Sequence, residues 1–188
     1  MAKLVRGLSL LLLLICSVST QWVSGSVPKV SAERIRLIKE IQERLNVSFQ
    51  CEFSISIGDT RKYAMANSGG IIIVDRSFLQ NADRGRIFFA IAHEYAHAYL
   101  EHDVRLFAMA LDQDATPTKS AVEARRRFEK EADGIAARKA KEMGFSIDSI
   151  LDFILSQPDP EKGIPFEYRV YSKPRERADY ILTVYHSS

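Results

Sequence analysis

Apolar and polar positions recur with two different periods along the chain, and each period predicts one kind of secondary structure. Between residues 32 and 46 apolar side chains recur every three or four residues, which predicts an amphipathic helix. Residues 51–57 alternate apolar and polar side chains, which is the period of a half-buried strand. Two further short stretches, 62–67 and 71–74, lie on either side of a Ser-Gly-Gly turn. Residues 51–74 therefore predict a small antiparallel sheet with an edge strand.

The remainder of the chain has the helical period almost throughout. Apolar residues recur at helical spacing from residue 83 to about 103, and again from the end of a polar loop at 112–119 to Met143. A shorter helix is expected at 146–155, before two prolines, and a last one at 175–185. Together with the strands, this pattern predicts the α+β class, with a small sheet packed on a core of helices.

The N-terminal residues predict a secretory signal peptide. Lys3 and Arg6 precede an apolar run at 8–18, which is shorter than the roughly 20 residues that a membrane-spanning helix needs. Small side chains follow this run, as a signal peptidase requires. We therefore expect residues 1–25 to be a cleaved signal and residues 26–188 to be a single domain, exported to the periplasm or the extracellular space. An uncleaved N-terminal anchor is the alternative.

Composition and charge narrow the range of functions. The 188 residues are 46% hydrophobic and 27% charged, values typical of a soluble globular protein. Lys3 and Arg6 are the only charged residues of 1–25, and without them the acidic and basic residues balance. A neutral domain has no overall charge that attracts nucleic acid, so we expect no nucleic-acid partner. Cys51 is the one cysteine left after the signal, so no internal disulfide is expected.

The strongest chemical signal is the sequence His93-Glu94-Tyr95-Ala96-His97 within the helix expected at 83–103. Side chains four residues apart lie on the same face of a helix, so both imidazoles can reach one metal ion. Glu94 lies one step around the helix, where it can contact a water molecule on that metal. Zinc suits this set, because it accepts neutral imidazoles and lowers the pKa of a bound water to about 7. The alternative is a half-buried helix with incidental histidines.

A catalytic zinc site of this kind needs a third ligand. The continuation with a glycine and a third histidine is excluded, because Leu100 and Asp103 occupy those positions. A glutamate from the following helix is the other source, and Glu129 can ligate the metal there. Asp133 lies four residues later on the same face, where it can accept a hydrogen bond from the far nitrogen of a ligating histidine. A solvated charged face beside residues 125–127, all arginine, is the alternative.

These residues resemble those of a known family. The HEYAH sequence at 93–97, the Glu-x-x-Ala-Asp sequence at 129–133 and His102 resemble the HtpX-like and CAAX-prenyl-protease type of zinc metallopeptidase, within the gluzincin clan. Weaker similarity extends over about residues 60–185 and includes a hairpin with paired glycines at 64–74. The resemblance implies a zincin core, in which the HExxH helix packs beside the helix that carries the glutamate.

The resemblance also assigns a role to each motif residue. It implies one Zn²⁺ per chain, bound by His93, His97 and Glu129. Asp133 would support a histidine ligand from behind, and Glu94 would be the general base. The implied function is a zinc-dependent metalloendopeptidase that hydrolyses peptide bonds of exported or misfolded proteins, by Glu94-assisted attack of zinc-bound water.

A polypeptide substrate is expected to lie extended along the edge strand. An unpaired strand edge binds peptide backbone with little dependence on its sequence. The expected edge includes Ala66, Asn67, Gly69 and Gly70. The partner is therefore a polypeptide, and a peripheral contact with a membrane is left open.

The chain departs from the family pattern near its C-terminus. Lys173 occupies the position of a late histidine that, together with a following arginine, stabilises the oxyanion in the family. Tyr171, Lys173 and Arg177 are the candidates for that role, and the sequence does not choose among them. His102 lies about 140° around a continuous helix from His97. We therefore expect it outside the zinc ligands, in a structural or supporting role.

Two other functions stay open. An ImmA-type minimal gluzincin also pairs an HExxH helix with a later Glu-x-x-Ala helix, but it acts on a cytoplasmic partner, and the signal segment and the Gly-Gly hairpin disfavour it. A non-catalytic zinc-binding or chaperone-like exported protein would keep the fold without rapid turnover. Lys173 is the feature that favours this second alternative.

Overall fold

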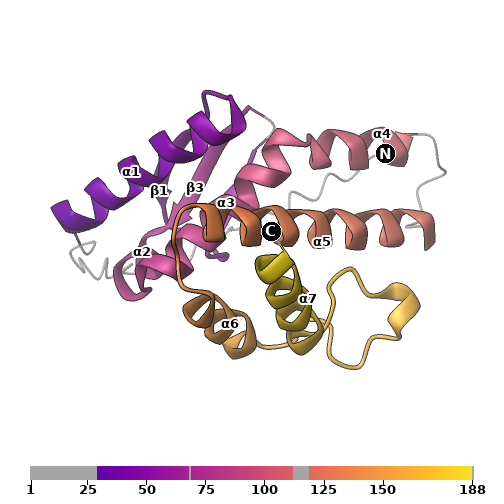
Figure 1. The fold of residues 1–188 in the computed structure, drawn as a ribbon. Helices are drawn as coiled ribbons and strands as arrows, with labels where there is room; N and C mark the ends of the chain where they lie inside the picture. Colours follow the sequence, from indigo (N-terminus) through magenta and orange to yellow (C-terminus); the bar gives the residue numbers. More distant parts are fainter. Residues whose placement is uncertain (1–28, 68, 112–118, 188) are drawn as a thin grey trace, which may run out of the picture.

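The computed structural model describes residues 29–67, 69–111 and 119–187 of the protein (Figure 1). The described chain is α+β, as expected, with helices and a small mixed sheet. The elements are, in order, α1 (Ala32–Phe49), β1 (Ser54–Gly58), β2 (Ala64–Ala66), β3 (Ile71–Asp75), α2 (Arg76–Asn81), α3 (Arg84–Tyr99), α4 (His102–Leu111), α5 (Lys119–Glu142), α6 (Ile147–Ser156), the 3-10 helix η1 (Phe166–Tyr168) and α7 (Pro174–Ser187). The expected signal peptide at 1–25 and most of the expected loop at 112–119 lie outside the described residues.

The sheet has the strand order β1-β3-β2 and mixed strand directions. Strand β2 lies at one edge, as expected, and pairs antiparallel with β3, with Ala64 opposite Val74. Strand β1 pairs parallel with β3, with Ser54 opposite Ile71, so the prediction of a purely antiparallel sheet is wrong for this pair. The chain crosses from β1 to the far edge before it returns through the middle as β3. Alternation along a strand reports which side chains are buried and carries no information on strand direction.

The other edge of the sheet, along β1, is covered by polar side chains of α1. The Asn46 side-chain amide donates to the Phe53 carbonyl at 2.9 Å, and Asn46 Oδ1 accepts the Phe53 N–H at 3.1 Å. Gln42 Oε1 accepts the Ile55 N–H at 3.0 Å. Backbone groups that could pair with a further strand are therefore already satisfied along this part of β1.

Helix α3 lies at the centre of the core. It packs against the sheet on one side and against α5 on the other (Figure 1). Its side chains Ile87, Phe88, Ile91 and Tyr95 are fully buried, because neighbouring elements cover several of its faces. Helix α7 packs against α5 and α6 and completes the helical layer. The HExxH residues are therefore carried by a helix that the core anchors.

The single helix expected at 83–103 is divided in the structure. Helix α3 ends at Tyr99, Glu101 adopts a left-handed conformation with φ of 52°, and α4 begins at His102. Apolar spacing continues across this break, so the period could not reveal it. The short helix α2, capped by the Asp75 carboxylate, was not expected either, because its six residues are too few to show a period.

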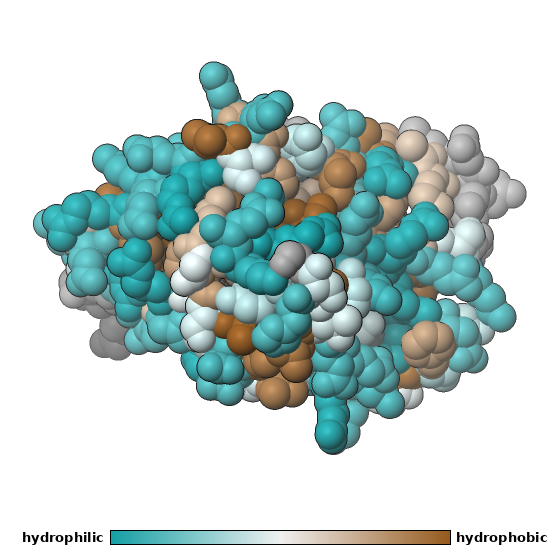
Figure 2. Space-filling view, in the orientation of Figure 1, coloured by the Kyte–Doolittle hydropathy of each residue, from teal (hydrophilic) through white to brown (hydrophobic). Residues whose placement is uncertain are grey.

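The outer surface is mostly polar in the orientation of Figure 2, which shows apolar side chains in scattered groups. A mostly polar surface is expected for a chain with 46% hydrophobic and 27% charged residues, because the charged side chains stay in contact with water. Within the part of the chain that the structure describes, no helix combines the length and the apolar character that a membrane crossing requires.

Candidate metal centre and active site

The two motif histidines lie on the same face of α3, the face toward α5. The Asp83 carboxylate begins this helix by accepting the Arg86 N–H at 3.0 Å. The Nε2 atoms of His93 and His97 lie 3.0 Å apart. Both side chains are largely buried, with 12% and 15% of their surface exposed. The four-residue spacing therefore brings the two imidazoles together at the wall of a cleft.

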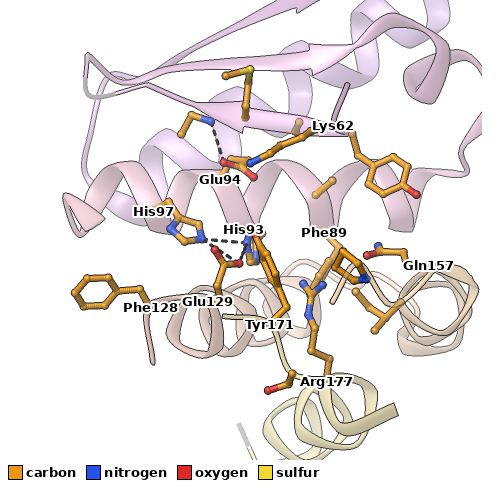
Figure 3. A pocket seen from close by; sticks show the side chains of 18 of the residues that line it. Lys62, Phe89, His93, Glu94, His97, Phe128, Glu129, Gln157, Tyr171 and Arg177 are labelled. Carbon is orange, nitrogen blue, oxygen red and sulfur yellow. Dashed lines mark hydrogen bonds and ion pairs between the residues drawn. The ribbon is translucent and has the colours of Figure 1, made fainter. Parts of the chain in front are cut away.

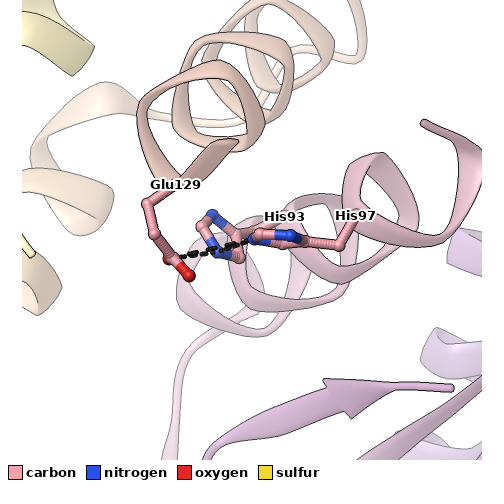
Figure 4. Close-up of side chains that lie close together, drawn as sticks. All are labelled: His93, His97 and Glu129. Atoms are coloured by element: carbon pink, nitrogen blue, oxygen red, sulfur yellow. Dashed lines mark hydrogen bonds and ion pairs between the residues drawn. The ribbon is translucent and has the colours of Figure 1, made fainter. Parts of the chain in front are cut away.

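Glu129 reaches this pair from α5, and Figure 4 shows the three side chains converging. Its Oε2 atom lies 3.4 Å from His93 Nε2 and 3.8 Å from His97 Nε2. One ligand atom from each residue lies within 4.8 Å of the other two. Zinc ligands at about 2.0–2.2 Å in a tetrahedron are about 3.3–3.6 Å from one another. The spacing of the three donors therefore fits a zinc ion.

Asp133 lies behind His93 and is itself paired with a cation. Asp133 Oδ1 is 2.9 Å from His93 Nδ1. Arg177 of α7 donates to both carboxylate oxygens of Asp133, through Nε and Nη2, each at 2.7 Å. Burial raises the pKa of Asp133, but the charge and hydrogen bonds of Arg177 outweigh it and hold this pKa below its usual value. The carboxylate therefore stays ionised although only 1% of the residue is exposed.

The charges of this site favour a cation among its side chains. Burial alone would lower the pKa of His93, but Asp133 and Glu129 beside it raise that pKa to about 10. Burial would raise the pKa of Glu129, and the imidazoles of His93 and His97 instead lower it. A site that stabilises an added proton on an imidazole also suits a divalent cation, since the sign of the charge is the same. Two imidazoles and one carboxylate are a donor set that zinc accepts.

Glu94 lies on the opposite side of the cleft from Glu129, next to the edge strand β2 (Figure 3). Its Oε2 atom accepts the Ala66 N–H at 2.9 Å. The Asn67 N–H donates to the Ile71 carbonyl of β3, so the preceding N–H of Ala66 faces away from β3. The Glu94 carboxylate is therefore oriented by the open edge of β2.

The cleft has a volume of about 600 Å³ and contains the candidate ligands. Residues 61–66 form one wall, and α3, α5 and the segment before α7 contribute to the others. Phe128 lies beyond His97 at one end, and Phe89 lies beyond His93 toward the other (Figure 3). Aromatic side chains thus flank the polar centre along the cleft.

The structure brings one of the four predicted edge residues to the cleft. Ala66 lines it, whereas Asn67, Gly69 and Gly70 form the turn between β2 and β3. Asn67 Oδ1 accepts the N–H groups of Gly69 and Ile71, each at 3.0 Å, and so closes this turn. The residues of this part of the chain that line the cleft are therefore 61–66.

The three candidates for an oxyanion stabiliser occupy different places. Tyr171 lines the cleft beside Glu129, and burial together with the charge of Glu129 raises the pKa of its phenol (Figure 3). Arg177 also lines the cleft, but its Nε and Nη2 atoms bind Asp133. Lys173 is exposed and is not part of the cleft lining. The structure therefore separates Tyr171 from the other two.

A network of charged side chains holds the segment that carries Tyr171. The Glu161 carboxylate accepts the N–H groups of Val170 and Tyr171 at 3.1 and 2.8 Å. Arg169, which is 4% exposed, forms an ion pair with Asp159 at 2.7 Å. The sequence does not predict this network, because the segment has no hydrophobic period. The available signal was Asp159, Glu161 and Arg169 close together in a stretch without a hydrophobic period.

His102 and Glu131 form a second contact that the sequence analysis did not identify. His102 Nδ1 lies 3.0 Å from His97 Nδ1, and His102 Nε2 lies 3.4 Å from Glu131 Oε2. Burial, with His97 beside it, lowers the pKa of His102 to about 4. The left-handed residue Glu101 places His102 there, and no sequence period indicates such a bend.

A comparison with known protein families gives a match to the first part of the chain. The model described as peptidase family M48 matches residues 28–122, which is half of the chain. The match includes the HExxH residues His93, Glu94 and His97, and it ends before Glu129. Neither a curated protein nor a solved structure matched the chain.

Proposed function

The chain belongs to peptidase family M48, and we propose that it is a zinc-dependent metalloendopeptidase of the gluzincin type. The observation that carries the proposal is the convergence of one ligand atom each from His93, His97 and Glu129. In the proposal these three residues hold the zinc ion. When bound, zinc supplies a Lewis acid that polarises the scissile carbonyl and lowers the pKa of water to about 7.

Glu94 is the proposed general base. Its carboxylate lies on the side of the cleft next to β2, where its Oε2 atom accepts the Ala66 N–H at 2.9 Å. This hydrogen bond orients the carboxylate and leaves lone pairs of Oε1 for a proton. Glu94 takes the proton of the attacking water and then transfers it to the leaving amine, so the carboxylate is regenerated at the end of each cycle.

A polypeptide would bind as an additional strand beside β2. In an antiparallel pair, successive residues direct their N–H and C=O groups alternately toward the partner and away from it. Tyr63 and Asn67 bond to β3, so the backbone groups of Ala64 and Ala66 face the cleft. Main-chain pairing of this kind gives affinity with little dependence on the side chains of the substrate. The proposal is therefore an endopeptidase that accepts unfolded segments.

Zinc content and its link to proteolysis test the proposed function. We expect the purified protein to bind one zinc ion and to cleave unfolded casein, and a chelator to abolish this cleavage. His93→Ala and Glu129→Ala should each lose stoichiometric zinc, because each removes one of three protein ligands. Glu123→Ala, which alters an exposed glutamate on the same helix as Glu129, is the matched control and should retain zinc.

Two results would contradict this assignment. Full zinc content in His93→Ala and Glu129→Ala would refute the ligand set. Zinc binding by the unaltered protein without any cleavage that a chelator inhibits would favour a non-catalytic zinc-binding protein instead.

Tyr171 is the proposed donor to the oxyanion, since it lines the cleft beside Glu129 whereas Lys173 does not. Replacing Tyr171 with Phe removes the phenolic proton and keeps the ring. We expect kcat to fall by about 10²-fold with a smaller change in KM, as found for the loss of one oxyanion donor. Lys173→Ala is the matched control and should leave both constants near their original values. Equal effects of the two substitutions in steady-state kinetics would remove Tyr171 from this role.

A further inference from the structure

His102 lies directly behind one of the two candidate histidine ligands. Its Nδ1 atom is 3.0 Å from His97 Nδ1, and its Nε2 atom is 3.4 Å from Glu131 Oε2. The ring is fully buried and stacks on Phe128, with ring centroids 4.3 Å apart and planes inclined by 7°. The stacking and the two polar contacts together leave this imidazole little freedom to rotate.

The distances determine which nitrogen carries each proton. His97 Nε2 faces His93 Nε2 and Glu129 Oε2, so it must be unprotonated to bind a metal ion. The proton of His97 is then on Nδ1. Two Nδ1 atoms at 3.0 Å need one proton between them, so His102 accepts with Nδ1 and carries its own proton on Nε2. That proton points to the Glu131 carboxylate.

We propose that His102 is a positioning residue that fixes the tautomer and the orientation of His97, and that Glu131 does the same for His102. The proposal rests on the proposed zinc site for its purpose. It differs from the arrangement at the other histidine, where a buried carboxylate, Asp133, lies 2.9 Å from His93 Nδ1. The two candidate ligands are therefore supported by different chemistry, one by an anion and the other by a neutral imidazole that an exposed glutamate holds.

A bend of the backbone makes this contact possible. On a continuous helix, residue 102 would lie about 140° around the axis from His97 and would point away from it. The chain instead leaves α3 after Tyr99, passes through Glu101 with φ of 52° and begins α4 at His102. Residues other than glycine rarely adopt a backbone conformation with positive φ. The fold thus maintains an unfavourable backbone angle at the point that turns His102 toward His97.

The first test measures zinc affinity of the full chain by competition with a metal buffer. We expect His102→Leu to raise the Kd for zinc by about 10–100-fold, the range found when a group that supports a metal ligand is removed. His102→Gln should restore most of the affinity, because its amide oxygen can accept the proton of His97 Nδ1. An affinity of His102→Leu equal to that of the unaltered protein would overturn the proposal.

The second test observes the tautomers and uses a variant that should fold, because the Glu131 side chain is 43% exposed. In ¹⁵N NMR spectra of histidine-labelled protein, we expect a protonated Nδ1 for His97 and a protonated Nε2 for His102. In the metal-free protein, where no metal fixes the His97 tautomer, Glu131→Ala should shift the His102 signals toward a mixture of tautomers, and Glu123→Ala on the same helix should not. Unchanged His102 signals in Glu131→Ala would overturn the role of Glu131, and a His97 protonated on Nε2 in the zinc-loaded protein would overturn the whole proposal.

These readouts separate the inference from the proposed function. A protein that binds zinc but cleaves no polypeptide would refute the peptidase proposal and leave the positioning role of His102 intact. If the unaltered protein cleaves casein and His102→Leu binds zinc as tightly as it does, the positioning role of His102 is refuted and the peptidase proposal stands.

Discussion

Glu94→Gln is expected to abolish most of the proteolytic activity while the protein still binds one zinc ion. The amide keeps the size of the side chain and can still accept the Ala66 N–H, but it cannot take a proton from water. General base catalysis contributes about 10²–10⁴-fold to a rate, so kcat/KM should fall by about that factor. Cleavage of casein, together with metal analysis of the same sample, measures both quantities.

The control for this substitution is Glu123→Gln, which makes the same chemical change at an exposed position of α5. It should retain both activity and zinc. If Glu94→Gln cleaves casein as fast as the control, another group must act as the base. If Glu94→Gln loses zinc, the carboxylate contributes to the metal site itself, which the distances among His93, His97 and Glu129 do not require.

The second large effect is expected for Asp133→Ala, and it concerns stability. This substitution leaves the guanidinium of Arg177 without the carboxylate that binds it at 2.7 Å through two nitrogens. Removing one partner of a buried ion pair lowers the free energy of unfolding by about 3–5 kcal/mol. Urea denaturation of the metal-free protein measures this loss apart from any effect on zinc.

A second ion pair of the same helix provides the control. Lys139 and Glu142 lie 2.8 Å apart, but the glutamate is 52% exposed, so Glu142→Ala should cost only about 0–1 kcal/mol. The double variant Asp133→Ala, Arg177→Met should recover part of the loss, because no unpaired buried charge remains. A cost below about 1 kcal/mol for Asp133→Ala alone would mean that water reaches Arg177 and solvates it.

The helices and the side chains that the two motifs place around His93 were predictable from the sequence, because both depend on local spacing. The apolar period placed α1 and α5 near their observed bounds, although α1 continues to Phe49, where Gln50 ends it in a left-handed conformation. The four-residue step placed the imidazoles of His93 and His97 on one face. The same step placed Glu129 and Asp133 on one face of α5, and both reach His93.

The other parts of the site depend on contacts that no period encodes. Strand β1 runs parallel to β3 because the chain crosses the sheet between β1 and β2. Apolar and polar residues alternate in the same way for a parallel and an antiparallel strand, so the sequence pattern could not show this direction. The bend at Glu101 is a property of one residue, so the contact of His102 with His97 could not be foreseen. The segment with Tyr171 is held by ion pairs and hydrogen bonds among residues without regular spacing.

The side chains of α1 that cover β1 have a consequence for what the sheet can bind. A small sheet has two edges, and each is a place where a foreign strand could add. Asn46 and Gln42 already occupy backbone groups of Phe53 and Ile55 at one edge. In the proposed function, an added strand would therefore pair at the opposite border of the sheet, where Glu94 lies beside β2. For the proposed peptidase, the helix that shields β1 would thus direct an extended polypeptide to the border that carries the proposed general base.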